Sequence, residues 1–174
     1  MIVKNYTGDA INFGLARERW NATHPGKETI KMIAVGDDVA VPRSSIVLTG
    51  RRGLAATNLV QKVAGALAKK GASLEEVHHL AKLVADRSGS IGMGLEHCHV
   101  PGTETAEAYL KADEAEIGMG IHNEPGNRKI SPVPKAKDTI EQLMSMLTDT
   151  SDKERAYLDF KSQSRSRKTT SAED

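Results

Sequence analysis

The chain lacks the sequence features that are typical of secreted, membrane-spanning or nucleic-acid-binding proteins. Of its 174 residues only Cys98 is a cysteine, which excludes an internal disulfide and favours a reducing compartment. No apolar run approaches the roughly 18 residues that a transmembrane helix requires, and the N-terminus has no signal-peptide pattern. The formal net charge is only +1, which gives no electrostatic argument for nucleic acid or a membrane as main partner. These absences predict a soluble, cytoplasmic protein.

Aromatic residues are also scarce, at 3% of the chain against 39% for all hydrophobic residues. The core must therefore be aliphatic, which suits buried parallel strands with helices packed on them. The length fits one domain of ordinary size. Met1 to Val3 resemble the end of a buried strand, and strands usually run about five or six residues. We therefore expect the chain to be a fragment.

The order of apolar patterns predicts an α/β fold built on a βαβ unit. The first strand is followed by an amphipathic helix over residues 9–20, with Asp9 as N-cap, and by a strand over residues 30–35. Ligands of such sheets bind beyond the carboxyl ends of the strands. Asp9 and the pair Asp37 and Asp38 are predicted to lie at that edge. Asp9 could therefore act there as a base, or it could serve only as the helix cap.

Further elements are predicted along the rest of the chain. Ser73 and Glu76 form a capping box at a helix start. The stretch over 162–174 is polar, rich in serine and arginine, and predicted to be disordered. The remaining predictions are helices over 54–70, 73–87 and 135–147, strands over 90–100 and 115–122, and a loop over 101–113.

One histidine stands out by its position. His122 is predicted to end an apolar strand and to precede a tight turn, in Gly-Met-Gly-Ile-His-Asn-Glu-Pro-Gly over residues 118–126. A neutral imidazole there can act as a nucleophile or as a general base. The alternative is a histidine that caps the strand and hydrogen-bonds its turn, and a single motif does not decide between them.

For other polar groups, too, a role in binding a ligand has to be weighed against a purely structural one. Asp37 and Asp38 could share Mg²⁺ only on an irregular backbone, because adjacent strand residues point to opposite faces. Gly-Arg-Arg-Gly over residues 50–53 either cradles an anion before a helix or pins the loop through arginine hydrogen bonds. His97 and His99 would share one face of a strand, but two histidines are only half of a tetrahedral zinc site.

Five segments together resemble the substrate-binding K domain of dihydroxyacetone kinases, in particular that of the fungal single-chain, ATP-dependent enzymes. They are Val-Lys-Asn-Tyr-Thr-Gly-Asp over 3–9, Val-Gly-Asp-Asp over 35–38, Gly-Arg-Arg-Gly over 50–53, Cys-His-Val-Pro-Gly over 98–102 and Gly-Ile-His-Asn-Glu-Pro-Gly over 120–126. The resemblance implies a fragment of the first α/β subdomain, mostly βαβ with helices packed on a sheet. It predicts a partial K domain over 1–161 and a polar tail over 162–174.

The resemblance implies roles for three residues. In the family, a histidine of the segment that matches His122 binds the ketone carbonyl of dihydroxyacetone covalently, as a hemiaminal. Asp9 would be the general base that takes the proton of the attacking substrate hydroxyl, and Lys4 would hydrogen-bond the substrate. The family phosphorylates dihydroxyacetone and related short ketoses and aldehydes with ATP and Mg²⁺. The chain itself is predicted to have no metal site.

The resemblance also implies parts that are not found in this sequence. A glycine-rich loop with a second active-site histidine should precede the segment that matches Lys4, and an ATP-binding helical L domain should follow the K domain. We therefore expect the isolated chain to be inactive by itself. The alternatives are a non-catalytic remnant that pairs with itself or with a full-length homologue through a sheet edge, and an incomplete gene product.

Overall fold

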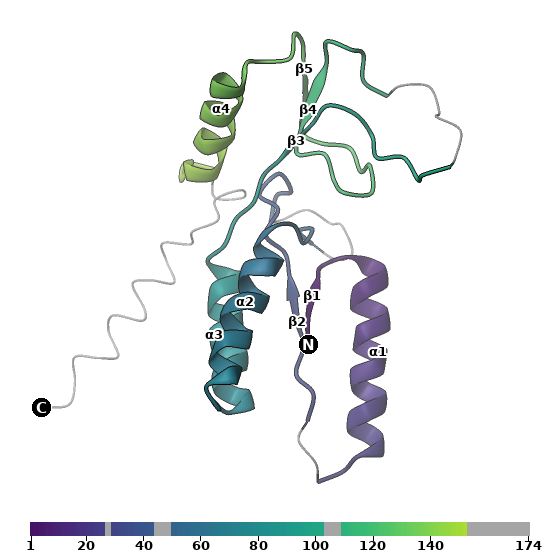
Figure 1. Cartoon of the computed structure of the whole chain (residues 1–174), viewed down its shortest axis with the longest axis vertical. Helices are drawn as coiled ribbons and strands as arrows, with labels where there is room; N and C mark the ends of the chain where they lie inside the picture. Colours follow the sequence, from purple (N-terminus) through teal and green to yellow (C-terminus); the bar gives the residue numbers. More distant parts are fainter. Residues whose placement is uncertain (27–28, 44–49, 103–108, 153–174) are drawn as a thin grey trace, which may run out of the picture.

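The structure, a computed structural model, describes residues 1–26, 29–43, 50–102 and 109–152. The helices and strands form two groups (Figure 1). One has a two-stranded parallel sheet with three helices, and the other a three-stranded antiparallel sheet with one helix. In chain order the elements are β1 (Ile2–Lys4), α1 (Thr7–Thr23), β2 (Ile33–Val35), α2 (Ala56–Lys69), α3 (Leu74–Asp86), β3 (Met93–Gly94), β4 (Ala115–Ile117), β5 (Arg128–Ile130) and α4 (Ala136–Thr148).

The predicted βαβ unit and α/β class are confirmed. β1 and β2 are parallel, with Val3 opposite Ala34 and Lys4 opposite Val35, and α1 connects them. In Figure 1, α1 lies on one side of the two strands while α2 and α3 lie together on the other. The carboxyl ends of β1 and β2 therefore face the loops that carry the candidate site residues.

The core of the first group is small and aliphatic, as the scarcity of aromatic residues predicts. Val35 of β2, Val60 and Ala64 of α2 and Ala81 of α3 are buried together. Partly buried side chains extend this cluster, among them Ile2 and the α3 residues Val77, Val84 and Ala85. Burial of this apolar surface holds α2 and α3 against the strands.

The helices after the first are predicted well by the sequence. α2, α3 and α4 lie within the predicted ranges to within two residues at each end. The capping box of α3 is confirmed, because the Ser73 hydroxyl accepts the Glu76 N–H while the Glu76 carboxylate accepts the Ser73 N–H.

The start of α1 corrects the prediction for Asp9. The helix begins at Thr7, and Tyr6 is its N-cap without a side-chain capping bond. Asp9 instead lies in the first turn, where its negative charge is favourable beside the exposed N–H groups of the helix. The prediction that Asp9 is the N-cap was wrong because Asp is favoured in both positions.

The two later strand predictions were largely wrong. Over 90–100 only Met93 and Gly94 form a strand, while Ser90 makes a single bridge to Asp38. Over 115–122 the strand ends at Ile117, since Gly118 has a positive φ of 78° and the chain turns there. The predicted tail over 162–174 and part of the predicted loop over 101–113 lie outside the described residues.

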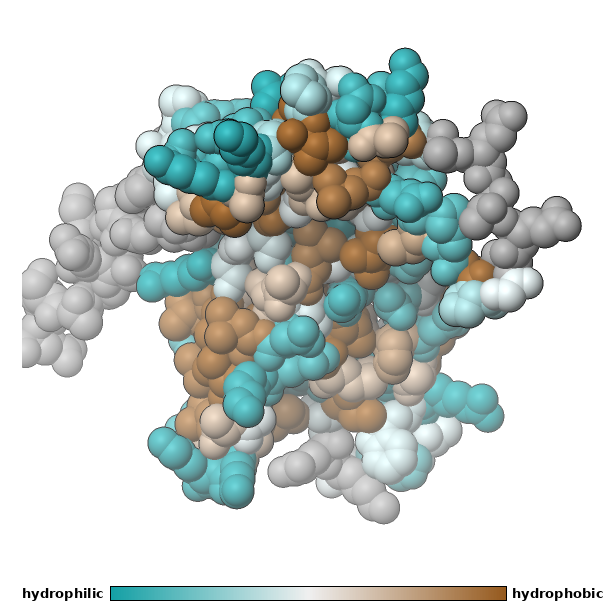
Figure 2. Space-filling view, turned by 45° about the horizontal axis from the view of Figure 1, so that its top comes forward, coloured by the Kyte–Doolittle hydropathy of each residue, from teal (hydrophilic) through white to brown (hydrophobic). Residues whose placement is uncertain are grey.

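Apolar side chains also reach the surface, as the space-filling view shows (Figure 2). α1 buries none of its residues, and Ile11, Phe13, Leu15 and Trp20 are exposed along it. Among the described helices, none combines the length and the apolar character that a bilayer crossing requires.

Candidate functional site

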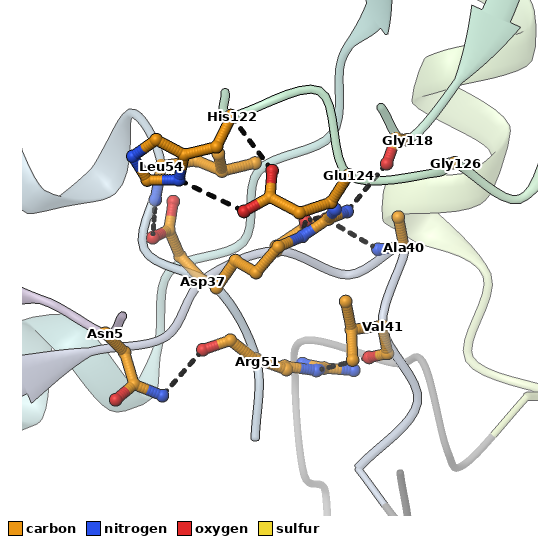
Figure 3. Close-up of polar contacts among 12 residues, drawn as sticks. Asn5, Asp37, Ala40, Val41, Arg51, Leu54, Gly118, His122, Glu124 and Gly126 are labelled. Atoms are coloured by element: carbon orange, nitrogen blue, oxygen red, sulfur yellow. Dashed lines mark hydrogen bonds and ion pairs between the residues drawn. The ribbon is translucent and has the colours of Figure 1, made fainter. Parts of the chain in front are cut away.

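The loop over residues 50–53 closes over the carboxyl ends of β1 and β2. A Cβ atom at Gly53 would lie 2.6 Å from the Val35 carbonyl oxygen, 2.7 Å from the Asn5 nitrogen and 2.8 Å from the Lys4 Cα. The Asn5 side chain donates to the Arg51 carbonyl oxygen at 2.8 Å, as Figure 3 shows. Only glycine allows the loop to approach the strand ends this closely.

Asp37 caps α2, although it lies far before that helix in the sequence. It is fully buried, and its two carboxylate oxygens accept the N–H groups of Leu54 at 2.7 Å and Ala56 at 2.9 Å. Both oxygens are thus used at a helix N-terminus, where a negative charge is stabilised.

Asp38 pairs with Arg52 in the interior. The Arg52 Nε lies 2.7 Å from Asp38 Oδ2, and the Arg52 Nη2 donates to the Gly118 carbonyl oxygen at 2.6 Å. Burial raises the pKa of Asp38, and the Arg52 guanidinium offsets part of that effect. The Arg51 Nε donates to the Val41 carbonyl oxygen at 3.0 Å. Of the two alternatives for the segment over 50–53, the structure favours the one in which arginines pin the loop.

His122 lies in a loop beside the junction of β1 and α1. Its ring meets the ring of Tyr6 edge-on, with centroids 4.7 Å apart and an angle of 85° between the planes. The His122 side chain is 61% exposed, so a small molecule can reach the ring from solvent. The contact brings together the segments over 3–9 and 120–126, which are far apart in the sequence.

Tyr6 keeps its proton in this position. Burial, followed by the negative charge of Glu124, raises the pKa of the phenol to about 12. Within the described residues the Tyr6 hydroxyl is buried and has no hydrogen-bond partner. A buried donor in this state gains from any ligand that supplies an acceptor.

Glu124 holds the His122 loop through two contacts with His122. Its Oε2 accepts the His122 N–H at 2.9 Å, and its Oε1 lies 3.1 Å from the His122 Nδ1. Burial alone would raise the pKa of Glu124. The hydrogen bonds from its own N–H and from His122 outweigh burial, so the pKa lies below its ordinary value. In Figure 3 the two side chains face one another.

Asn123 fastens the same loop to a neighbouring segment. Its side chain accepts the Cys98 N–H at 2.8 Å and donates to the Cys98 carbonyl oxygen at 3.0 Å. Asn123 has a φ of 64°, a conformation that asparagine adopts more readily than most residues. These bonds, together with those of Glu124, define the turn that presents His122.

The structure places the three predicted site residues in one region of the fold. Lys4 ends β1, Asp9 lies in the first turn of α1, and Tyr6 between them touches His122. Lys4 and Asp9 are both half-buried. Within the described residues no hydrogen bond links either of them directly to His122. His122 itself does not end a strand, which corrects that prediction.

Metal-ligand chemistry finds little support among the described residues. No group of three or more His, Cys, Asp or Glu side chains there could hold a metal ion. His97 stacks on Tyr109 with centroids 4.1 Å apart, whereas the His99 Nε2 lies 3.5 Å from Glu96. The prediction that His97 and His99 share one face of a strand was wrong, because their segment forms no strand.

The sequence pointed to His122 but not to the residues that hold it. Glu124, Asn123 and Tyr6 all belong to segments that the sequence singles out, yet none was assigned a role. The His-x-Glu spacing was the available signal, since a tight turn can bring residues two apart into contact. The structure has a parallel βαβ unit with polar loops at the carboxyl edge of its strands. These features define an α/β protein whose candidate site lies at that edge.

The comparisons with known proteins identify the family. The family model described as the Dak1 domain matches residues 1–167. Dihydroxyacetone kinase 2 of Saccharomyces cerevisiae is 49% identical over 160 residues, which cover 92% of this chain and 26% of that protein. The chain belongs to the dihydroxyacetone kinase family, as part of a Dak1 domain.

Solved structures agree with this assignment. The crystal structure of the dihydroxyacetone kinase of C. freundii in its native form is similar with a TM-score of 0.72 and 38% identity, covering 83% of this chain and 26% of that one. The structure of that kinase in complex with AMP-PNP and Mg²⁺ has a TM-score of 0.71 and 37% identity, covering 86% and 27%. The chain thus spans about a quarter of the length of these relatives.

Proposed function

We propose that this chain is a dihydroxyacetone-binding part of a dihydroxyacetone kinase and that His122 captures the ketone covalently. The observation that carries the proposal is the contact between Tyr6 and His122, because it joins the two segments to which the family resemblance assigns the chemistry. The exposed imidazole supports it, since covalent capture needs a nucleophile that the substrate can reach.

The covalent step is an addition without a leaving group. A lone pair of an imidazole nitrogen forms a bond to the carbonyl carbon, and the π electrons of the C=O bond move to its oxygen. That oxygen takes up a proton while the ring loses one, so the product is a neutral hemiaminal with the whole substrate added. Covalent attachment orients a small polar ligand that offers little apolar area.

Two further roles are part of the proposal. Asp9 takes the proton of a substrate hydroxyl as its oxygen bonds to the phosphorus of the donor, while the bond from phosphorus to the nucleoside diphosphate breaks. Lys4 donates a hydrogen bond to the substrate. Both lie beside Tyr6, at the carboxyl edge where ligands of parallel sheets bind.

ATP and Mg²⁺ enter the proposal through the family alone. The acidic side chains at the sheet edge do not fit a Mg²⁺ site, because Asp37 and Asp38 already accept hydrogen bonds from protein groups. We therefore derive no step on the metal from these residues. We propose that the nucleotide is bound by a separate L domain and that this chain alone transfers no phosphoryl group. A cytoplasmic location remains part of the proposal.

The test is adduct formation with dihydroxyacetone labelled with carbon-13 at the carbonyl. We expect the chain to gain the full mass of one substrate in native mass spectrometry, and the labelled carbon to shift from a ketone to a tetrahedral signal in NMR. His122→Ala should abolish both, whereas His79→Ala, an exposed histidine of α3, should leave them unchanged. No adduct in the wild type, or an adduct that survives His122→Ala, would falsify the proposal.

A second candidate function is association with itself or with a longer homologue. α1 favours it, because the helix buries none of its residues and Leu15 is 65% exposed. Size-exclusion chromatography of the chain, alone and mixed with a full-length dihydroxyacetone kinase, tests it. Co-elution that Leu15→Lys weakens supports association, while a free monomer in both runs argues against it.

A further inference from the structure

The carboxylate of Glu124 touches His122 twice, and the two contacts have different consequences. Oε2 accepts the backbone N–H of His122 at 2.9 Å, which fixes the carboxylate in the loop. Oε1 lies 3.1 Å from the ring nitrogen Nδ1, which fixes the ring. A Cβ atom at Gly120 would overlap Oε2, so glycine at this position leaves the space that the carboxylate occupies.

The direction of the ring hydrogen bond follows from the chemistry of the acceptor. An ionised carboxylate only accepts hydrogen bonds, and the lowered pKa of Glu124 keeps it ionised at neutral pH. The proton between the two side chains must therefore sit on Nδ1. In a neutral imidazole the other nitrogen, Nε2, then holds the free lone pair.

We propose that Glu124 is a positioning residue that holds His122 in the Nδ1–H tautomer, so that Nε2 presents its lone pair to the carbonyl carbon of the ketone. This inference rests on the proposed function of His122. Tyr6 restricts the ring plane through its edge-on contact, while Glu124 selects which nitrogen reacts.

The same contact stabilises the charge that develops during the addition. As the Nε2–C bond forms, the carbonyl π electrons become a lone pair on oxygen and the ring becomes positively charged. The Glu124 carboxylate stabilises that imidazolium. The Nδ1 proton then leaves and the alkoxide gains a proton through solvent, which gives the neutral hemiaminal.

Glu124→Gln tests the inference because the amide has one acceptor oxygen instead of two. If that oxygen keeps the backbone N–H of His122, the amide NH₂ faces Nδ1 and forces the proton onto Nε2. Nitrogen-15 NMR of the full chain with labelled histidine, at about pH 8 where histidine is neutral, reports the tautomer directly. We expect Nδ1–H in the wild type and Nε2–H in the variant.

Adduct formation gives the second measurement. We expect it to slow on the order of 10⁴-fold in Glu124→Gln, as for a catalytic histidine that is forced into the wrong tautomer when its orienting carboxylate becomes an amide. Glu141→Gln, which changes an exposed glutamate of α4, should alter neither the tautomer nor the rate. Wild-type His122 in the Nε2–H form, an unchanged tautomer in Glu124→Gln, or an unchanged rate would overturn the inference.

These outcomes separate the inference from the function on which it rests. If the wild type forms no adduct, the proposed function fails, while the tautomer still decides whether Glu124 orients the ring. If His122 forms the adduct and Glu124→Gln forms it equally fast, the function stands and the inference fails. Should the variant not fold, the wild-type tautomer alone remains decisive.

Discussion

At the scale of single residues, Gly53 sets how closely the loop over 50–53 can approach the strand ends. A methyl group there would press on backbone atoms of β1, β2 and Asn5, which cannot move aside as a flexible side chain can. The position therefore constrains the candidate site without contributing a side chain to it.

Gly53→Ala should destabilise the chain by about 1–3 kcal/mol, the usual cost of overpacking. Gly65→Ala is the matched control, because Gly65 lies within α2 with nothing near its missing Cβ. That change should stabilise the chain by roughly 0.5–1 kcal/mol, since alanine favours the helix. Urea unfolding of both variants measures the difference, and equal effects would contradict the close approach at Gly53.

The ionised state of Glu124 makes a prediction about pH. Its pKa is lower in the folded chain than the ordinary 4.5, so the folded state binds the proton less readily than the unfolded state. The stability that Glu124 contributes is therefore present above about pH 4.5 and is lost as the pH falls through the folded pKa. Wild type should lose more free energy of unfolding between neutral pH and pH 3 than Glu124→Gln does. If the free energy of unfolding of the two proteins changed equally with pH, this prediction would be wrong.

The sequence could identify His122 but not the contact that orients it. The histidine stands out through its motif, whereas a glutamate two residues later is as easily a solvated side chain. The contact depends on the turn at Asn123, with its positive φ, and on the space at Gly120. Both are properties of the folded loop that no residue pattern states directly.

At the scale of elements, α2 and α3 illustrate two ways of starting a helix. α3 is capped locally by exposed Ser73, while α2 is capped by buried Asp37 from the end of another segment. Water can replace a lost cap at an exposed helix end but not at a buried one. The two caps should therefore contribute different amounts to the free energy of unfolding.

Ser73→Ala should cost about 1 kcal/mol, the common value for an N-cap. Asp37→Ala should cost more, roughly 2–4 kcal/mol, because it removes a charged, buried acceptor from the N–H groups of Leu54 and Ala56 at once. Thermal and urea unfolding measure both. A smaller loss for Asp37→Ala than for Ser73→Ala would show that Asp37 does not cap α2.

The sequence predicted helices better than strands for a physical reason. α2, α3 and α4 are 13 or 14 residues long, so their apolar residues repeat often enough to show the helical period. β3, β4 and β5 have two or three residues each. Alternation cannot be established over so few positions, and the pairing of these strands is set by distant neighbours. The strand β5 was not predicted at all.

At the scale of the whole molecule, Arg52 connects the two groups of elements. It binds Asp38, which follows β2, and the carbonyl of Gly118, which follows β4. The guanidinium is largely buried and Asp38 almost completely so. This pair thus fixes the loop of His122 relative to the parallel strands.

Arg52→Met should destabilise the chain by about 3–5 kcal/mol, because it leaves the Asp38 charge buried without its partner. Combining it with Asp38→Asn should recover part of that loss, since the uncompensated charge is removed. Arg17→Met, which breaks an ion pair with Glu18 on the surface, should change stability by less than about 1 kcal/mol. Similar losses for Arg52→Met and Arg17→Met would contradict the connecting role of Arg52.

The contact between Tyr6 and His122 also has a consequence for the order of folding. The pair α2 and α3 joins neighbours in the sequence and can form early, whereas Tyr6 and His122 meet only after most of the chain has been brought back to its beginning. Closing so long a loop is slow relative to local structure. We therefore expect the candidate site to be completed late in folding, after α2 and α3 have packed together.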